Sequence, residues 1–163
     1  MSYSIFMTIP GIPGESLNKN FLNAIEVFSF SWAMAETVTN VTSSGGAGKP
    51  QFSDLIVNKI LDKSSPKLMQ ALVTGQHLQK VTLSLVKSAI GPSANKPFLT
   101  YEFDTVLVSS VQDSGSSGGD SAPSESISFA MERALVTYYT QNPDGSLGAS
   151  VMFSYNIATN TPV

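Results

Sequence analysis

The sequence predicts a mainly β protein, with two packed antiparallel sheets that form a β-barrel and one short α-helix on its flank. Most segments alternate apolar and polar residues with a period of two, as strands do when one face of a sheet is buried. Several of these segments exceed the usual roughly five to six residues of a strand, and a long open edge invites aggregation unless the sheet closes. Helical spacing occurs in one segment alone.

Seven segments are expected to be strands, at residues 4–9, 24–37, 51–58, 80–87, 98–108, 125–140 and 151–157. In residues 24–37 the apolar positions change parity between Val27 and Phe28, which predicts a β-bulge or a change in the face that is buried. A similar change follows Asp104 in residues 98–108, where the apolar positions move to Val106 and Val108.

The helix is expected over residues 66–74. Ser65 is a suitable N-cap, Pro66 fits the first helical position, and Gly75 can end the helix in a left-handed conformation. The apolar stripe that should pack against the sheet consists of Leu68, Met69, Leu72 and Val73. So short a helix needs such packing to be stable in water.

Composition limits the classes of partner. Charged residues make up 13% of the chain, about half the usual share, and the net charge is −3 without a basic cluster, so nucleic acid and anionic membranes are poor partners. Serine and threonine account for 37 of 163 residues, which suits either close contact with other protein or a β protein with hydroxyl-rich turns. We expect one domain over residues 1–163, made in the cytoplasm without a cleaved signal peptide and not inserted in a membrane.

Three short motifs resemble catalytic ones and fail on context. Residues 115–119 fit G-x-S-x-G inside a Gly/Ser run, residues 64–67 fit S-x-x-K without its companion motifs, and residues 45–49 lack the first glycine and the Ser or Thr of a phosphate loop. Glu102 and Asp104 should lie on the solvated face of a strand, and His77 has no partner at ligand spacing. We therefore expect no catalytic, cofactor-binding or metal-binding residue, no cofactor and no enzymatic activity.

Taken in order along the chain, the distinctive residues resemble the Hcp family (haemolysin-coregulated protein) of type VI secretion tube proteins. The matching segments are residues 14–16, 28–32, 45–49, 54–59, 62–64, 66–77, 106–111 and 153–157, together with Glu125 after a Gly-rich loop. They span essentially the whole chain. The family often has two tryptophans in the long strand, and this chain has Phe30 at the first of them, which keeps an aromatic side chain.

The resemblance implies a β-barrel that assembles into a homohexameric ring, and rings that stack into a tube inside a contractile sheath. The partners it implies are further copies of the chain, the spike protein, the sheath and baseplate, and effector proteins carried in the lumen. The tube would be expelled to the extracellular space or a target cell. Phage tail tubes use similar barrels. A monomeric barrel that binds a small molecule, and a hydrolase, remain alternatives.

Two surfaces are candidates for assembly. The Gly-rich segment 39–50 is expected to reach an adjacent ring or subunit, because its glycines allow close backbone approach and its lysine can pair with a carboxylate. The residues concerned are Ser44, Gly45, Gly46, Gly48 and Lys49. The small-residue face of segment 24–37, which carries Ser29, Ser31 and Ala33, is expected to face the lumen.

Overall fold

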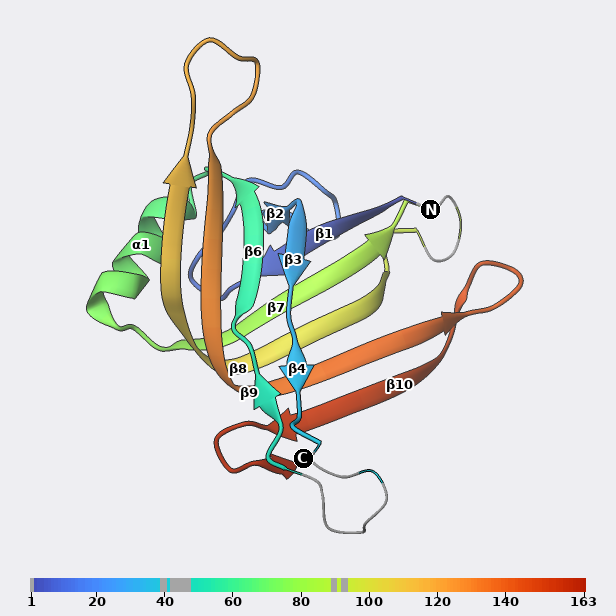
Figure 1. Cartoon of the computed structure of the whole chain (residues 1–163). Coiled ribbons are helices and arrows are strands. Elements are labelled where there is room, and N and C mark those ends of the chain that lie inside the picture. The colour runs from blue at the N-terminus through green and yellow to red at the C-terminus, as the bar shows by residue number, and fades with distance from the viewer. Residues whose placement is uncertain (1, 39–40, 42–47, 89–90, 92–93) are drawn as a thin grey trace.

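The computed structural model describes residues 2–38, 41, 48–88, 91 and 94–163. Within these residues the chain forms eleven strands and one helix (Figure 1). In chain order they are β1 (Tyr3–Thr8), β2 (Ile25–Val27), β3 (Ser29–Ser31), β4 (Met34–Ala35), β5 (Gln51–Phe52), β6 (Leu55–Ile60), α1 (Ser65–Thr74), β7 (Leu78–Lys87), β8 (Pro97–Ser114), β9 (Ser124–Gln141), β10 (Leu147–Asn156) and β11 (Thr161–Pro162). The expectation of a mainly β chain with one short helix is confirmed.

Nine strands form one branched sheet in which every pair is antiparallel. Its main path is β11-β10-β9-β8-β7-β1-β2, and a branch leads from β9 through β6 to β3. The branch arises because β9 pairs with β6 over residues 124–129 and with β10 over residues 133–141. Strands β4 and β5 form a separate two-stranded sheet.

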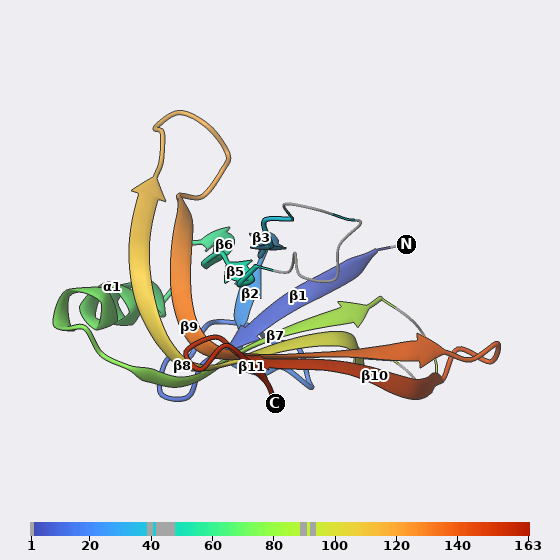
Figure 2. The same ribbon diagram turned by 60° about the horizontal axis from the view of Figure 1, so that its bottom comes forward.

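The two 18-residue strands β8 and β9 bend together and divide the sheet into two halves (Figure 2). Their register skips Thr105 and Glu132, and Thr105 has a left-handed φ of +52°. We call the strands β3 and β6, with residues 106–114 of β8 and 124–131 of β9, the front half. The back half comprises β1, β2, β7, β10 and the remaining parts of β8 and β9.

The expectation of two packed sheets that close into a barrel is wrong in two respects: the sheet does not close, and its two halves are not separate sheets. Strand β2 pairs with β1 and strand β3 pairs with β6, so the ladder is interrupted where the chain passes from one to the other. Phe28 lies at this point, and its N–H donates to the Asn58 carbonyl oxygen at 2.8 Å. This bond directs the chain towards β6 and away from β1, which leaves the sheet open there. The halves are also parts of one bent sheet, since β8 and β9 belong to both.

The expected change of parity in segment 24–37 is present but falls one residue later than expected. Ile25 and Val27 are buried, Phe28 is 61% exposed and so does not join the buried face, and Phe30 and Trp32 are the residues that next pack against the core. The segment 24–37 is therefore not one long strand but three short ones, β2, β3 and β4. In β8 the change of parity falls at Thr105, whose backbone turns the strand so that Phe103 and Val106 can both be buried.

The core lies between the front and back halves and extends to α1. Its fully buried apolar side chains come from both halves and the helix. They are Met7, Ile25, Leu55, Val57, Leu68, Val81, Leu83, Phe103, Val106, Ile127 and Phe129. The front half therefore has one face against the core and the other exposed.

The helix differs from its expected form in two respects. It runs Ser65–Thr74 with Ser64 as the N-cap, and Ser65 is buried in the first turn. Of the expected stripe, Leu68 is buried and Leu72 is partly buried, but Val73 is 80% exposed, so its placement in the core was wrong. Ala71 is buried instead. Gly75 ends the helix with φ +63°, as expected.

A row of three charged residues crosses the front half on its core side. Glu125 of β9 lies directly opposite Lys59 of β6 on one side and Asp113 of β8 on the other. Lys59 and Glu125 are fully buried, and the Lys59 Nζ lies 3.1 Å from the Glu125 Oε1. The Lys59 ammonium also pairs with Asp62 at 2.9 Å and donates to the Ser65 Oγ at 3.0 Å, which ties the sheet to the start of α1.

Burial raises the pKa of the Glu125 carboxyl, and the facing Asp113 adds to the rise while Lys59 opposes it. Neither carboxylate oxygen accepts a well-aligned hydrogen bond from the described residues. A raised pKa means that the folded chain holds this proton more tightly than the unfolded chain does. The stabilising contribution of Glu125 is therefore full below its unfolded pKa, about 4.3, and declines as the pH rises through the folded value.

We expect Glu125→Gln to gain stability relative to the original chain as the pH rises from about 4 to 7, because glutamine stays neutral. Urea denaturation across this pH range would measure the difference in the free energy of unfolding. Glu36→Gln, at an exposed position, serves as the control. A difference that stays constant with pH, or that grows in favour of the original chain, would contradict the argument.

Candidate functional site

The exposed face of the front half carries rows of small or uncharged side chains. Each row crosses the four strands β3, β6, β9 and β8 in register. One row is Ser29, Asn58, Ser126 and Gln112, and the next is Ser31, Ile56, Ser128 and Ser110. The Asn58 Nδ2 donates to the Ser29 Oγ at 3.0 Å, which places the two side chains on the same side. Neither row contains a charge.

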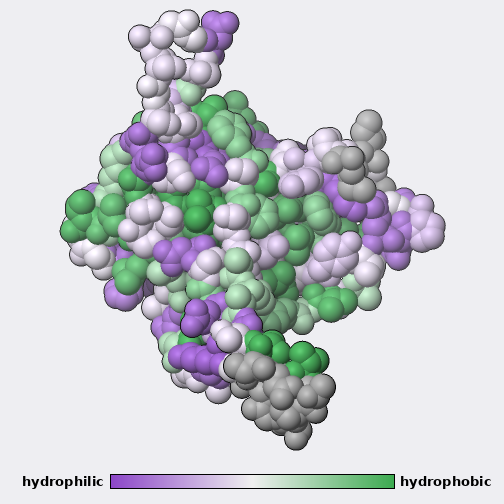
Figure 3. Space-filling view, in the orientation of Figure 1, coloured by the Kyte–Doolittle hydropathy of each residue, from purple (hydrophilic) through white to green (hydrophobic). Residues whose placement is uncertain are grey.

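Figure 3 looks onto the outer side of β3 and β6, where pale and green surface predominates over the central strands. The expected lumen residues Ser29 and Ser31 are exposed on this face, and Ala33 follows β3 with its N–H bonded to the Ser53 Oγ at 2.8 Å. The alternation of segment 24–37 identified the two serines. It could not identify Asn58 or Ser126, because their alignment depends on the register of strands far apart in the sequence.

Within the described residues the sheet has open edges at β2, which pairs with β1 alone, and at three further places. Strand β3 pairs with β6 alone, residues 107–114 of β8 pair with β9 alone, and β11 covers β10 at Tyr155 and Asn156 alone. On β10, Val151 is 65% exposed and Met152 is 61% exposed, on opposite faces of the strand. Open edges with apolar flanks promote pairing with another chain unless something covers them.

The glycine-rich segment expected to contact another ring or subunit is described in part. Ser44, Gly45 and Gly46 lie outside the described residues. Gly48 and Lys49 are exposed, and no ion pair involves Lys49 in the part of the chain that the structure describes. The assignment of this segment to a contact remains a prediction.

The acidic pair Glu102 and Asp104 lies on a partly exposed face, next to Lys80 of β7. The Lys80 Nζ is 3.3 Å from the Glu102 Oε1 and 3.7 Å from the Asp104 Oδ1. The hydrogen bond to Glu102 and the charges of both carboxylates raise the pKa of Lys80. The three residues thus form a charge cluster between adjacent strands. His77 is exposed beyond α1.

Among the described residues, no helix has the length and apolar character needed to cross a bilayer. Aromatic side chains cluster around the half-buried Trp32, whose ring centroid lies 5.2 Å from that of the buried Phe103 and 5.8 Å from that of the half-buried Phe52. Burial raises the pKa of the neighbouring Tyr101 hydroxyl. This cluster fixes the chain between β3 and β4 against the back half.

Comparison with known proteins identifies a family to which this chain is similar over most of its length. The family model described as "Type VI secretion system effector, Hcp" matches residues 6–138. Protein hcp1 of Pseudomonas aeruginosa is 33% identical over 162 residues, which cover 98% of each chain.

Solved structures give the same result. A type six secretion system protein superposes with a TM-score of 0.90 at 30% identity, over 99% of this chain and 100% of the other. Hcp1 from Salmonella typhimurium superposes with a TM-score of 0.81 at 28% identity, over the whole of both chains. A type VI secretion system effector from Yersinia pestis superposes with a TM-score of 0.75 at 28% identity, over 93% of this chain and 98% of the other. The chain belongs to the Hcp family of type VI secretion system proteins.

Proposed function

We propose that the chain is a structural subunit of the inner tube of a type VI secretion system, with no catalytic role. Six copies form a ring, rings stack into a tube, and the tube is expelled from the cytoplasm with effectors in its lumen. The spike protein, the contractile sheath and the baseplate are its further partners. Membership of the Hcp family supports this proposal, as do the surfaces of the front half.

The observation that carries the proposal is the uncharged face of the front half between two open edges. If β3 of one copy lies beside β8 of the next, each copy covers an edge that is otherwise open. Two different surfaces then meet, which is the heterologous contact that generates a closed ring. The rows containing Ser29 and Ser31 would face the lumen, where uncharged hydroxyls allow varied cargo to pass.

Native mass spectrometry of the purified chain, together with negative-stain images, tests the ring. The proposal requires a particle of six copies with a central hole. A monomer at micromolar concentration would contradict it and would favour a small-molecule-binding protein instead.

We expect Ser31→Arg to leave ring formation intact and to reduce the co-purification of effectors, because it adds a long charged side chain to the lumen. Gln76→Arg, at an exposed position after α1, introduces the same side chain away from the face and serves as the control. Pull-down of effectors by each ring would measure the effect. Equal recovery with both variants would show that the Ser31 face does not contact cargo.

A further inference from the structure

The buried carboxyl of Glu125 lies one strand away from an open edge of the sheet. Asp113 of β8 lies directly opposite it, and residues 107–114 of β8 have no partner strand on their other side within the described residues. Glu125 is 1% exposed, whereas Asp113 is exposed to solvent. Water therefore screens the charge of Asp113 for as long as this edge stays open.

A single ammonium group serves the carboxyls around this row. The Lys59 Nζ lies 3.1 Å from the Glu125 Oε1 and 2.9 Å from the Asp62 Oδ1. The next lysines along the chain, Lys63 before α1 and Lys67 within it, are exposed, and neither forms an ion pair with the described residues. A negative charge on Glu125 is therefore only partly balanced.

Covering the open edge of β8 would increase this imbalance. Burial raises the pKa of the Glu125 carboxyl, Lys59 lowers it, and Asp113 raises it further. In the proposed ring, β3 of the next copy lies along this edge and removes water from Asp113. Like charges repel more strongly when less water surrounds them, so Glu125 would hold its proton more tightly in the ring than in a separate copy.

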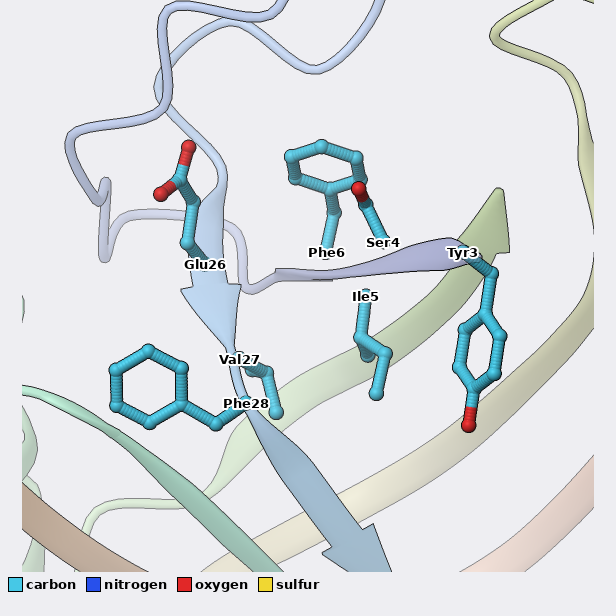
Figure 4. A pocket seen from close by; sticks show the side chains of 7 residues that line it. All are labelled: Tyr3, Ser4, Ile5, Phe6, Glu26, Val27 and Phe28. Atoms are coloured by element: carbon cyan, nitrogen blue, oxygen red, sulfur yellow. The ribbon is translucent and has the colours of Figure 1, made fainter. Parts of the chain in front are cut away.

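The strand that would cover this edge brings no compensating cation. Between residues 21 and 48 the only charged residues are Glu26 and Glu36, and both are acidic. Seven residues line a hollow of about 380 Å³ where β2 passes into β3, and Glu26 is the only charged one among them (Figure 4). The segment that contains β3 thus offers no positive charge to Asp113.

We propose that closure of the seam between copies takes up a proton at the Glu125 and Asp113 pair, so that rings hold together more tightly in mildly acidic than in alkaline solution. A ring that binds more protons than its separated copies loses stability as the pH rises, because the release of protons then favours separation. The inference rests on the proposed ring and adds a means of regulation to its seam.

The pH dependence of ring assembly tests this inference. We expect the protein concentration at which half of the copies are in rings to rise above about pH 4.3, by up to about tenfold for each pH unit, since each seam binds up to one proton. Asp113→Asn removes the facing charge and Glu125→Gln removes the site of the proton, so each should flatten this dependence. Asp120→Asn, which removes an exposed charge from the loop that joins β8 to β9, should keep it.

Sedimentation equilibrium across this pH range measures assembly. The heat of ring dissociation on dilution, compared between buffers of different ionisation enthalpy, counts the protons released. Rings of the original chain whose assembly ignores pH or strengthens as the pH rises, or an Asp113→Asn variant that keeps the full dependence, would overturn this inference and leave the proposed tube intact. An original chain that forms no rings would overturn the proposed tube, and this inference with it.

Discussion

Replacing Lys59 by methionine is expected to lower the free energy of unfolding by about 3–5 kcal/mol, the cost of removing one member of a buried ion pair. The Lys59 side chain is fully buried, and its ammonium lies within 3.1 Å of both Glu125 and Asp62. Without it, the Glu125 carboxylate stays buried with Asp113 as its facing charge. Denaturant unfolding monitored by the fluorescence of Trp32 would measure the loss.

Two comparisons make this prediction specific. Lys80→Met removes a lysine that also contacts two carboxylates but is 45% exposed, so its cost should be about 1 kcal/mol or less. Adding Glu125→Gln to Lys59→Met should recover part of the loss, because the uncompensated buried charge is removed. Equal costs for the Lys59 and Lys80 variants would show that the buried row contributes no more than a surface cluster does.

Leu68→Ala should cost about 2–5 kcal/mol, because it leaves a cavity in the core between α1 and the sheet. Leu68 is fully buried and belongs to the main apolar cluster. Val73→Ala, on the same helix but 80% exposed, should change stability by no more than about 0.5 kcal/mol. Leu72, which is partly buried, should give an intermediate value.

The measurement is again the free energy of unfolding for each variant. Far-UV circular dichroism controls for loss of the helix itself, since both substitutions place alanine, the best helix former, at their positions. If the Leu68 and Val73 variants lose equal stability, the helix packs in a different orientation from the one described.

The local features of the fold could be predicted because they depend on neighbouring residues. Alternation located the strands, and the changes of parity at Phe28 and Thr105 marked the two points where the backbone turns. Gly75 ended the helix for a reason visible in the sequence. Val73 was assigned to the wrong face because helical periodicity gives the width of an apolar stripe, and packing against β8 decides which part of it is buried.

The features that depend on strand register could not be predicted. Lys59 lies on the same face of β6 as Leu55 and Val57, but a charged residue at the end of a strand is ordinarily expected to reach solvent. Its burial depends on Glu125, which lies 3.1 Å away from it in space but far along the chain. The same reason applies to the uncharged face. Ser31 could be identified from the alternation of its own strand, but Ser128 lies in the same row only because β3 pairs with β6 and β6 pairs with β9.

The common bend of β8 and β9 has a mechanical consequence. Because both strands continue through Thr105 and Glu132, no flexible linker separates the two halves, and the Ile157 N–H braces the bend by donating to the Glu132 carbonyl oxygen at 2.7 Å. A force that pushes the front half along its strands must shear long antiparallel ladders, in which many hydrogen bonds resist at once. Thrust applied to one face of the molecule would thus reach the opposite face with little loss to internal flexing.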